Sequence, residues 1–261
     1  SDWAVPVQPL RRPLGVERLD QPRSCECDPM PPRPFGAAGG LSGHRRSNRV
    51  HFTLSSRRFV LRVGLVMLQG ARHSHISALE NASRETGIDI EILELRKASD
   101  LSSSEIHAIV IPGGESTTIR LTGNDPISDL LPAVFKWLRE DESRPVLGTC
   151  AGAILLMKPG DGGEPLVDAS IERNGFGSQA DSFQSALDAI TLGREFPGVF
   201  IRAPRFLGTG ENAQVTAELD GEVVGVMTEN RMALSFHPEL SQDSGFHEWL
   251  LRTAHGLEVD A

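Results

Sequence analysis

The fold is decided by residues 144–156, which read Arg-Pro-Val-Leu-Gly-Thr-Cys-Ala-Gly-Ala-Ile-Leu-Leu. A short apolar strand runs into Gly-Thr-Cys-Ala-Gly and then into an apolar run of helical length, which is typical of an elbow that holds a nucleophile above a sheet. Gly148 and Gly152 are expected where backbone segments come close and a Cβ would obstruct them. Cys150 would lie at a helix N-terminus, which favours the thiolate. On these residues alone, a small buried hydrophobic side chain explains Cys150 equally well.

The chain before the elbow indicates an α/β sheet. Residues 59–68 form an almost continuous apolar run, as expected of a strand buried on both faces. A helix is expected at 73–86, with Gly87 as its C′ residue. Two more strands are expected at 88–95 and 108–111, with a polar Ser-rich connection between them. This order predicts a three-layer, mostly parallel sheet flanked by helices.

Residues 112–118, Pro-Gly-Gly-Glu-Ser-Thr-Thr, follow the third strand directly. Two glycines there would let backbone N–H groups point outward and hold an oxyanion or a carboxylate. Taken alone, the stretch fits an ordinary turn with Ser116 as a helix N-cap better. No Gly-Lys-Ser/Thr follows, so the sequence does not support a phosphate-binding P-loop.

Two loops and one amphipathic helix are predicted around the elbow. Residues 127–140 place Leu and Val side chains on one helix face together with Trp137, which is more often a core residue than a ligand contact at such spacing. Residues 159–165 are Gly- and Pro-rich and predict a surface loop. Residues 172–179 are polar with one aromatic residue, which fits a loop lining a pocket as well as a structural turn.

The C-terminal part has the period of antiparallel strands, at 214–219, 222–227 and 231–236. The last strand runs into His237-Pro238-Glu239, where one turn could present an imidazole and a carboxylate on the same side. With Cys150, these residues supply what a Cys-His-acid relay requires. The other histidines form no ligand set with the spacing of a metal site, so neither a metal nor a cofactor is expected.

Charge separates the N-terminal segment from the rest. Residues 1–62 carry 11 Arg and 5 acidic residues, whereas the whole chain of 261 residues has a net charge of −9. The strongly acidic remainder is a poor match for nucleic acid, and the absence of an apolar run near 18 residues argues against a membrane protein.

Residues 1–58 are rich in Pro and Arg without periodicity, so we expect a disordered extension or translated upstream sequence before a catalytic domain at 59–255. A targeting peptide is the alternative, although five acidic residues speak against it. Cys25 and Cys27, one residue apart, are a weak signal for a metal or disulfide site. Three cysteines overall fit a reducing compartment, and we expect the cytoplasm.

The combination of residues 148–152 with residues 237–239 resembles the class I, or triad, glutamine amidotransferases. Four further stretches resemble the glutaminase subunits of pyridoxal 5′-phosphate synthase: 68–71 with His75, 111–118, 172–183 and 200–204. The resemblance covers about residues 62–252. It implies a flavodoxin-like fold with a C-terminal antiparallel portion and hydrolysis of L-glutamine to glutamate and ammonia. It also implies a separate synthase (lyase) subunit as partner in a hetero-oligomer.

The resemblance also implies roles for individual residues. Cys150 would be the nucleophile, His237 the general base and then acid, and Glu239 the carboxylate that orients it. The backbone N–H groups of Gly114 and Ala151 would form the oxyanion hole. Further residues would bind the substrate or the partner: Gly113, Gly114, Glu115, Ser116, Arg173, Asn174, Ile201 and Arg202 for the amino-acid end of glutamine, and Gln69 for the synthase interface.

Three departures from the family pattern leave the triad intact. Ser178 stands where Arg is usual, Phe176 stands where Tyr is common, and the 58-residue leader is foreign to the family. Three alternatives remain open at this point: a glutaminase subunit that serves a different synthase, a catalytically idle interaction subunit with the same fold, and a small Cys hydrolase acting on peptides.

Overall fold

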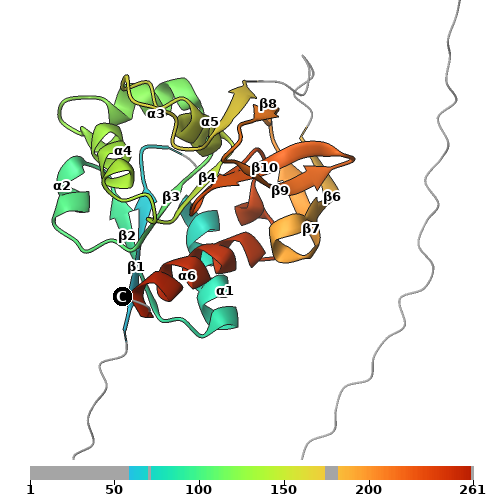
Figure 1. Ribbon diagram of the computed structural model, residues 1–261. Coiled ribbons are helices and arrows are strands. Elements are labelled where there is room, and N and C mark those ends of the chain that lie inside the picture. The colour runs from blue at the N-terminus through green and yellow to red at the C-terminus, as the bar shows by residue number, and fades with distance from the viewer. Residues whose placement is uncertain (1–58, 70–71, 174–181, 260–261) are drawn as a thin grey trace, which may run out of the picture. The chain divides into compact units, whose positions relative to one another are not determined.

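The computed structural model describes residues 59–69, 72–173 and 182–259. Within these ranges, nine strands form one sheet in the order β2-β1-β3-β4-β11-β10-β9-β6-β7, with helices on both faces (Figure 1). Neighbouring strands from β2 to β11 pair in parallel, and those from β11 to β7 pair antiparallel. The predicted parallel body with a C-terminal antiparallel portion is therefore confirmed. No helix in the described part of the chain is long and apolar enough to cross a membrane.

The parallel body contains five strands and six helices, which have these bounds: β1 Leu61–Val66, α1 Arg72–Thr86, β2 Ile90–Leu95, α2 Ala98–Ser102, β3 Ala108–Ile111, α3 Ser116–Gly123, α4 Leu130–Glu140, β4 Val146–Thr149, α5 Ala151–Met157, β11 Arg231–Leu234 and α6 Gly245–Val259. The antiparallel part and the connections contain the remaining elements: β5 Ala169–Glu172, β6 Phe183–Ala189, η1 Ile190–Leu192, β7 Arg194–Phe200, β8 Arg205–Thr209, β9 Gln214–Leu219, β10 Glu222–Thr228 and η2 Pro238–Leu240.

The three layers follow from the alternation of side chains along buried strands. On β1, Leu61, Val63 and Leu65 are fully buried and join the core that includes α1 and α6. On β3, Ile109 and Ile111 join the opposite core, to which α2 through α5 contribute. Figure 1 shows α1 and α6 side by side on one face of the sheet.

The strands and helices predicted before the elbow are present, and their boundaries differ from the predicted ones by at most three residues. The residue after α1, Gly87, has a φ of +72°, as the left-handed end of a helix requires. The polar Ser-rich connection before β3 contains a short helix, α2, which the sequence analysis did not predict. The carboxylate of Asp100 explains this helix, because it accepts hydrogen bonds from the backbone N–H groups of Arg96 (2.9 Å) and Lys97 (3.1 Å).

The antiparallel portion is larger than the sequence indicated. Strands β6 and β7 extend the main sheet, and β5 pairs with β8 in a separate two-stranded sheet. Strand β11 is antiparallel to β10 and parallel to β4, so it joins the two halves of the main sheet.

The carboxyl ends of three neighbouring strands bring the expected site together. Strands β3, β4 and β11 lie next to one another in the sheet. The chain leaves β3 into residues 112–115, leaves β4 into Cys150 and leaves β11 toward His237. In α/β sheets, ligands bind outside the carboxyl ends of the strands, so the topology places the turn, the thiol and the imidazole where a site is expected.

Candidate active site

Cys150 lies on a strained turn between β4 and α5. Its φ is +48° and its ψ is −102°, a conformation that L-residues adopt rarely. Its backbone N–H donates to the carbonyl of Leu234 on β11 at 2.8 Å, which fixes the turn to the neighbouring strand. A Cβ at Gly152 would lie 2.0 Å from the carbonyl oxygen of Ile111, so only glycine allows this close packing. The local backbone is therefore an elbow that presents the Cys150 side chain at the carboxyl end of the sheet.

His237 and Glu239 come from one turn after β11. The backbone N–H of His237 donates to the carbonyl of Val199 at 2.8 Å, which ties this turn to β7. Nδ1 of His237 lies 2.7 Å from Oε1 of Glu239. The Glu239 side chain is completely buried, and the His237 side chain is 11% exposed. The turn therefore presents both side chains to each other, as the two-residue spacing predicted.

Two partners favour the charged form of the His237 imidazole. Burial alone would lower the pKa of His237, but hydrogen bonds with the Cys150 sulfur and with the Glu239 carboxylate, together with their charges, raise it to about 10. The imidazole therefore carries two protons at neutral pH. The positive charge of His237 thus lies beside the Cys150 sulfur.

Glu239 is ionised although it is buried. Burial would raise its pKa, but the hydrogen bond with His237 and the histidines around it hold the pKa of Glu239 below its ordinary value. The carboxylate therefore fixes His237 with Nδ1–H toward Glu239 and leaves Nε2 for the sulfur.

The turn after β3 packs against this group. A Cβ at Gly113 would lie 2.4 Å from Cε1 of His237, and Gly114 has a φ of +145°, so both positions require glycine. The helix N-cap that follows is Glu115 and not Ser116, because its carboxylate accepts from the N–H groups of Thr117 (3.0 Å) and Thr118 (2.7 Å).

Glu115 also holds Arg173, which approaches from the end of β5. An Nη of Arg173 lies 2.5 Å from the Glu115 carboxylate, and the other donates to Oγ1 of Thr117 at 2.9 Å. Hydrogen bonds from Thr117 and Thr118 lower the pKa of Glu115 to about 2, so the carboxylate is ionised throughout the physiological range. One carboxylate and one guanidinium, the two groups that an α-amino acid needs as partners, thus lie at the same edge of the site.

A cavity of about 580 Å³ lies above Cys150. It is lined by residues from the elbow, the turn after β3 and the segment after β7: Gly114, Glu115, Ser116, Cys150, Ala151, Ile154, Arg173, Ser182, Ile201, Arg202 and His237. The Cys150 sulfur lies 3.9 Å from the carbonyl oxygen of Ile201. Arg202 has a φ of +46°, so the chain turns sharply at the cavity wall.

Comparison with known proteins identifies the family. Residues 65–255 match the model of the SNO glutamine amidotransferase family. The chain belongs to this family. Its members' defining reaction is the transfer of the amide nitrogen of glutamine, so the chain is a glutamine amidotransferase with glutaminase activity.

The SNO family chain has close curated relatives. It is 41% identical over 197 residues to the pyridoxal 5′-phosphate synthase subunit PdxT of Methanothermobacter thermautotrophicus. The aligned region covers 74% of this chain and 96% of that relative. It is 40% identical over 203 residues to the protein of the same name from Thermococcus gammatolerans, covering 75% and 100%. A crystal structure of a glutamine amidotransferase matches with a TM-score of 0.61 and 39% identity, covering 74% of this chain and 98% of that one.

The structure brings together most of the residues predicted for the SNO family site. The predicted site residues that fall within the described ranges lie at or next to the cavity. Gln69 contacts the edge of the cavity, since its Oε1 accepts from the N–H of Glu115 at 2.8 Å. Asn174, Phe176 and Ser178 lie outside the described residues. Sequence reasoning missed Ile154 and Ser182 in the lining.

The sequence also gave no indication that His75 and His247 lie behind Glu239. His75 was recognised only as part of the motif after the first strand, and His247 was noted only as a histidine without metal-site spacing. Both are fully buried in the structure.

Proposed function

We propose that this chain is the glutaminase subunit of a pyridoxal 5′-phosphate synthase, acting in the cytoplasm through a domain formed by residues 59–255. The observation that carries the chemistry is the contact of Cys150, His237 and Glu239 at the base of a cavity that also exposes Glu115 and Arg173. The relatives' names support the biological role, because they are subunits of this synthase.

The first half of the reaction forms a thioester. The Cys150 thiolate attacks the side-chain amide carbon of glutamine, and the carbonyl oxygen becomes an oxyanion within reach of the N–H groups of Ala151 and Gly114. One such donor contributes about 3 kcal/mol to lowering the barrier. His237 then gives its Nε2 proton to the amide nitrogen, the C–N bond breaks, and ammonia leaves.

The second half regenerates the enzyme. Neutral His237 takes a proton from water, and the resulting hydroxide attacks the thioester carbon. The C–S bond breaks, glutamate leaves, and the sulfur returns as thiolate beside protonated His237. Glu239 stays ionised throughout and holds the imidazole in the orientation that both halves require.

Substrate selection follows from the charges at the cavity edge. The Glu115 carboxylate suits the α-ammonium group of glutamine, and the Arg173 and Arg202 guanidinium groups suit its α-carboxylate. Ser116 and the Ile201 segment complete the wall against which the substrate lies. The free amino acid, rather than a glutamine within a peptide, is therefore the proposed substrate.

Ammonia release from L-glutamine tests this function. Wild-type chain should release ammonia, and Cys150→Ser should retain the fold but less than about a thousandth of the activity. Equal near-ultraviolet circular dichroism of the two proteins is the control for folding. A Cys150→Ser rate comparable to that of wild type would contradict the assignment of the nucleophile, and release from glutaminyl peptides but not from glutamine would favour a peptide hydrolase.

A further inference from the structure

Two further histidines lie near the proposed catalytic acid, and one of them contacts it. His75 projects from the first turns of α1 and His247 from the first turn of α6. Both side chains are fully buried, and Nδ1 of His75 lies 3.2 Å from Nε2 of His247. Nε2 of His75 lies 3.4 Å from Oε1 of Glu239, the same oxygen that His237 contacts.

Burial keeps both of these histidines neutral. It lowers the pKa of His75, although the charge of Glu239 opposes this effect, and it lowers the pKa of His247 to about 3. A hydrogen bond between two neutral imidazoles needs one donor and one acceptor. The pair therefore has two possible arrangements, which differ in the nitrogen of His75 that carries the proton.

The carboxylate selects between the two arrangements. If His75 donated from Nδ1, the lone pair on its Nε2 would face a buried carboxylate at 3.4 Å, which is repulsive. If His247 donates from Nε2 to Nδ1 of His75, then Nε2 of His75 carries the proton on the side that lies 3.4 Å from Glu239. That contact lacks the geometry of an ordinary hydrogen bond, but the attraction between the N–H dipole and the carboxylate is favourable. The second arrangement leaves no lone pair opposite the carboxylate.

We propose that His75 is a positioning residue of the glutaminase site, which directs its Nε2–H toward the Glu239 carboxylate through an electrostatic contact of 3.4 Å and is held in that tautomer by His247. This inference rests on the proposed function, because it gives Glu239 the role of orienting His237. Glu239 is thus held from two sides, by His237 of its own turn and by His75 of α1. The other ionisable groups near it are His247 behind His75 and Cys150 beyond His237.

The second donor matters because of the unpaired oxygen of Glu239. Oε2 has no hydrogen-bond partner among the described residues, so Oε1 alone anchors the carboxylate. Without His75, the hydrogen bond with His237 and the contact with the backbone N–H of Glu239 itself would hold the carboxylate, which could then rotate more easily away from the orientation that serves the imidazole. At 3.4 Å the contact is longer than an ordinary hydrogen bond, so its loss should have a moderate effect on rate.

Kinetics of His75 variants test the proposal. The amide of His75→Gln can place an N–H near the position of Nε2, whereas His75→Leu fills the space without a donor. We expect His75→Leu to lose about fivefold to tenfold in kcat with KM within about twofold, and His75→Gln to recover most of that loss. His73→Leu, an exposed position on the same helix, should match wild type. All four proteins are assayed for ammonia release with the synthase present.

The pH dependence separates positioning from a merely structural role. Loss of a donor to the charged carboxylate raises the pKa of Glu239, and protonated Glu239 no longer accepts from His237. The acidic limb of kcat/KM should therefore move to higher pH in His75→Leu and stay in place in His75→Gln. A folded His75→Leu variant with the wild-type kcat and the wild-type acidic limb of kcat/KM would overturn the proposal. A His75→Gln variant as slow as the His75→Leu variant would overturn it as well.

A third variant covers the case in which His75→Leu does not fold. The amide of His75→Asn can reach the position of Nδ1, toward His247, but not that of Nε2. His75→Asn should then be slower than His75→Gln at similar thermal stability, and equal rates would overturn the proposal. Absence of ammonia release by wild type would be a failure of the proposed function instead, so the two failures are distinguishable.

Discussion

The imidazole of His237 lies between two groups that both stabilise its positive charge. Cys150 contributes through its sulfur, and Glu239 contributes through a hydrogen bond of 2.7 Å and a buried negative charge. Removal of one of these three side chains leaves the other two buried without one of their partners. A single substitution therefore affects the charge state of all three. The pH dependence of the reaction is therefore the most direct measure of this arrangement.

Glu239→Gln should move the alkaline limb of activity to lower pH. His237 has a pKa raised to about 10, and its protonated form is lost as the pH rises through that value. The glutamine amide keeps the shape of the side chain but removes the negative charge, so the pKa of His237 should fall toward its ordinary value near 6.5. The measurement is kcat/KM for ammonia release between neutral and alkaline pH. An unchanged limb would show that Glu239 does not tune His237.

Single residues differ in how far the sequence predicted them. Cys150 and the His237–Glu239 pair were predictable because each motif follows a buried strand within a few residues. The contact of His75 with His247 was not, because it joins residues 172 positions apart on two helices. Each of these histidines looks like a core residue in the sequence, and only the packing of α1 on α6 brings the two rings together.

At the scale of elements, two helices point their N-termini at the cavity. Helix α3 begins at Ser116 after the turn at residues 112–115, and α5 begins at Ala151 after Cys150. Arg120 of α3 donates from both Nη groups to the carbonyls of Lys158 and Pro159, which follow α5. The guanidinium thus ties α3 to the chain that follows α5. We expect this contact to restrain the two helices whose N-termini carry the proposed oxyanion donors.

Arg120→Lys should therefore reduce both stability and activity. Lysine keeps the charge but cannot donate to two carbonyls in a fork. Because Arg120 is partly exposed, we expect a loss of only about 1 kcal/mol in the free energy of unfolding, with a fall in kcat greater than the change in KM. Denaturant unfolding and ammonia release measure the two effects. Lys136→Ala, which removes an exposed i,i+4 pair with Glu140, should leave both near wild type, and an equal response of the two variants would contradict the role of Arg120.

Apolar runs predicted most of the buried elements, but β6, β7 and α2 needed information from the tertiary structure. β7 contains Pro197, which argues against a strand in a sequence reading. It is tolerated because β7 is the edge strand of the sheet. Helix α2 has only five residues and one buried apolar side chain, Leu101, so no periodicity marks it.

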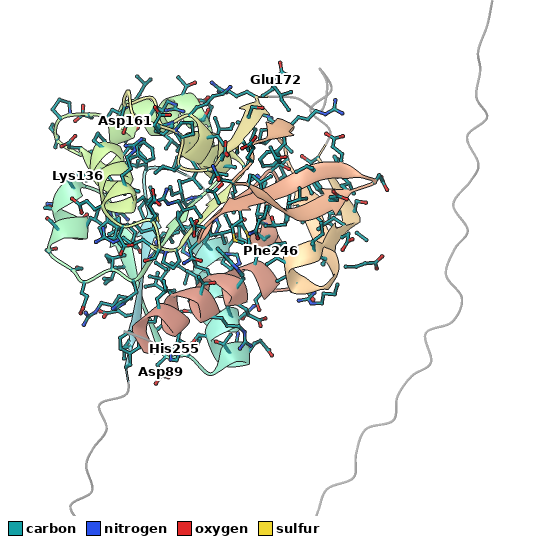
Figure 2. All side chains as sticks on the ribbon, viewed as in Figure 1. Asp89, Lys136, Asp161, Glu172, Phe246 and His255 are labelled. Carbon is teal, nitrogen blue, oxygen red and sulfur yellow. The ribbon has the colours of Figure 1, made fainter. Side chains whose placement is uncertain are left out.

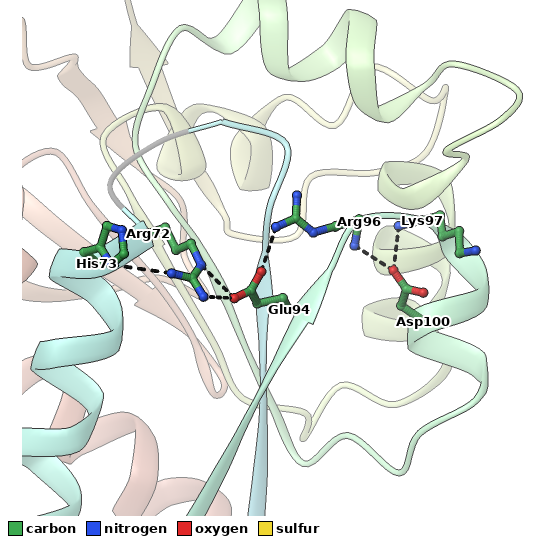
Figure 3. A network of polar contacts seen from close by, with 6 residues as sticks. All are labelled: Arg72, His73, Glu94, Arg96, Lys97 and Asp100. Carbon is green, nitrogen blue, oxygen red and sulfur yellow. Dashed lines mark hydrogen bonds and ion pairs between the residues drawn. The ribbon is translucent and has the colours of Figure 1, made fainter.

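At the scale of the whole molecule, Gln69 and the first turn of α1 connect the surface to the site at two points. Gln69 is exposed and accepts from the N–H of Glu115, next to the proposed oxyanion turn, whereas His75 contacts Glu239. Between them, Arg72 pairs with Glu94 of β2, which also pairs with Arg96 (Figure 3). This anchor holds the first turn of α1 on the sheet. Lys136 of α4, Asp161 of the loop after α5 and Glu172 of β5 are labelled among the side chains of the other parts of the domain (Figure 2).

We propose that the synthase docks at Gln69, and this docking should therefore raise the glutaminase rate. A protein bound there would act on residues 112–115 through Gln69 and on Glu239 through the first turn of α1. We expect slow ammonia release by the isolated chain and faster release after addition of the cognate synthase. Gln69→Ala should reduce the stimulation by the synthase more than it reduces the basal rate, because it removes the hydrogen bond between Gln69 and the N–H of Glu115. Arg96→Ala, an exposed position near the same anchor, is the matched control. Equal rates with and without the synthase would contradict the coupling, and full stimulation of Gln69→Ala would place the coupling elsewhere on the surface.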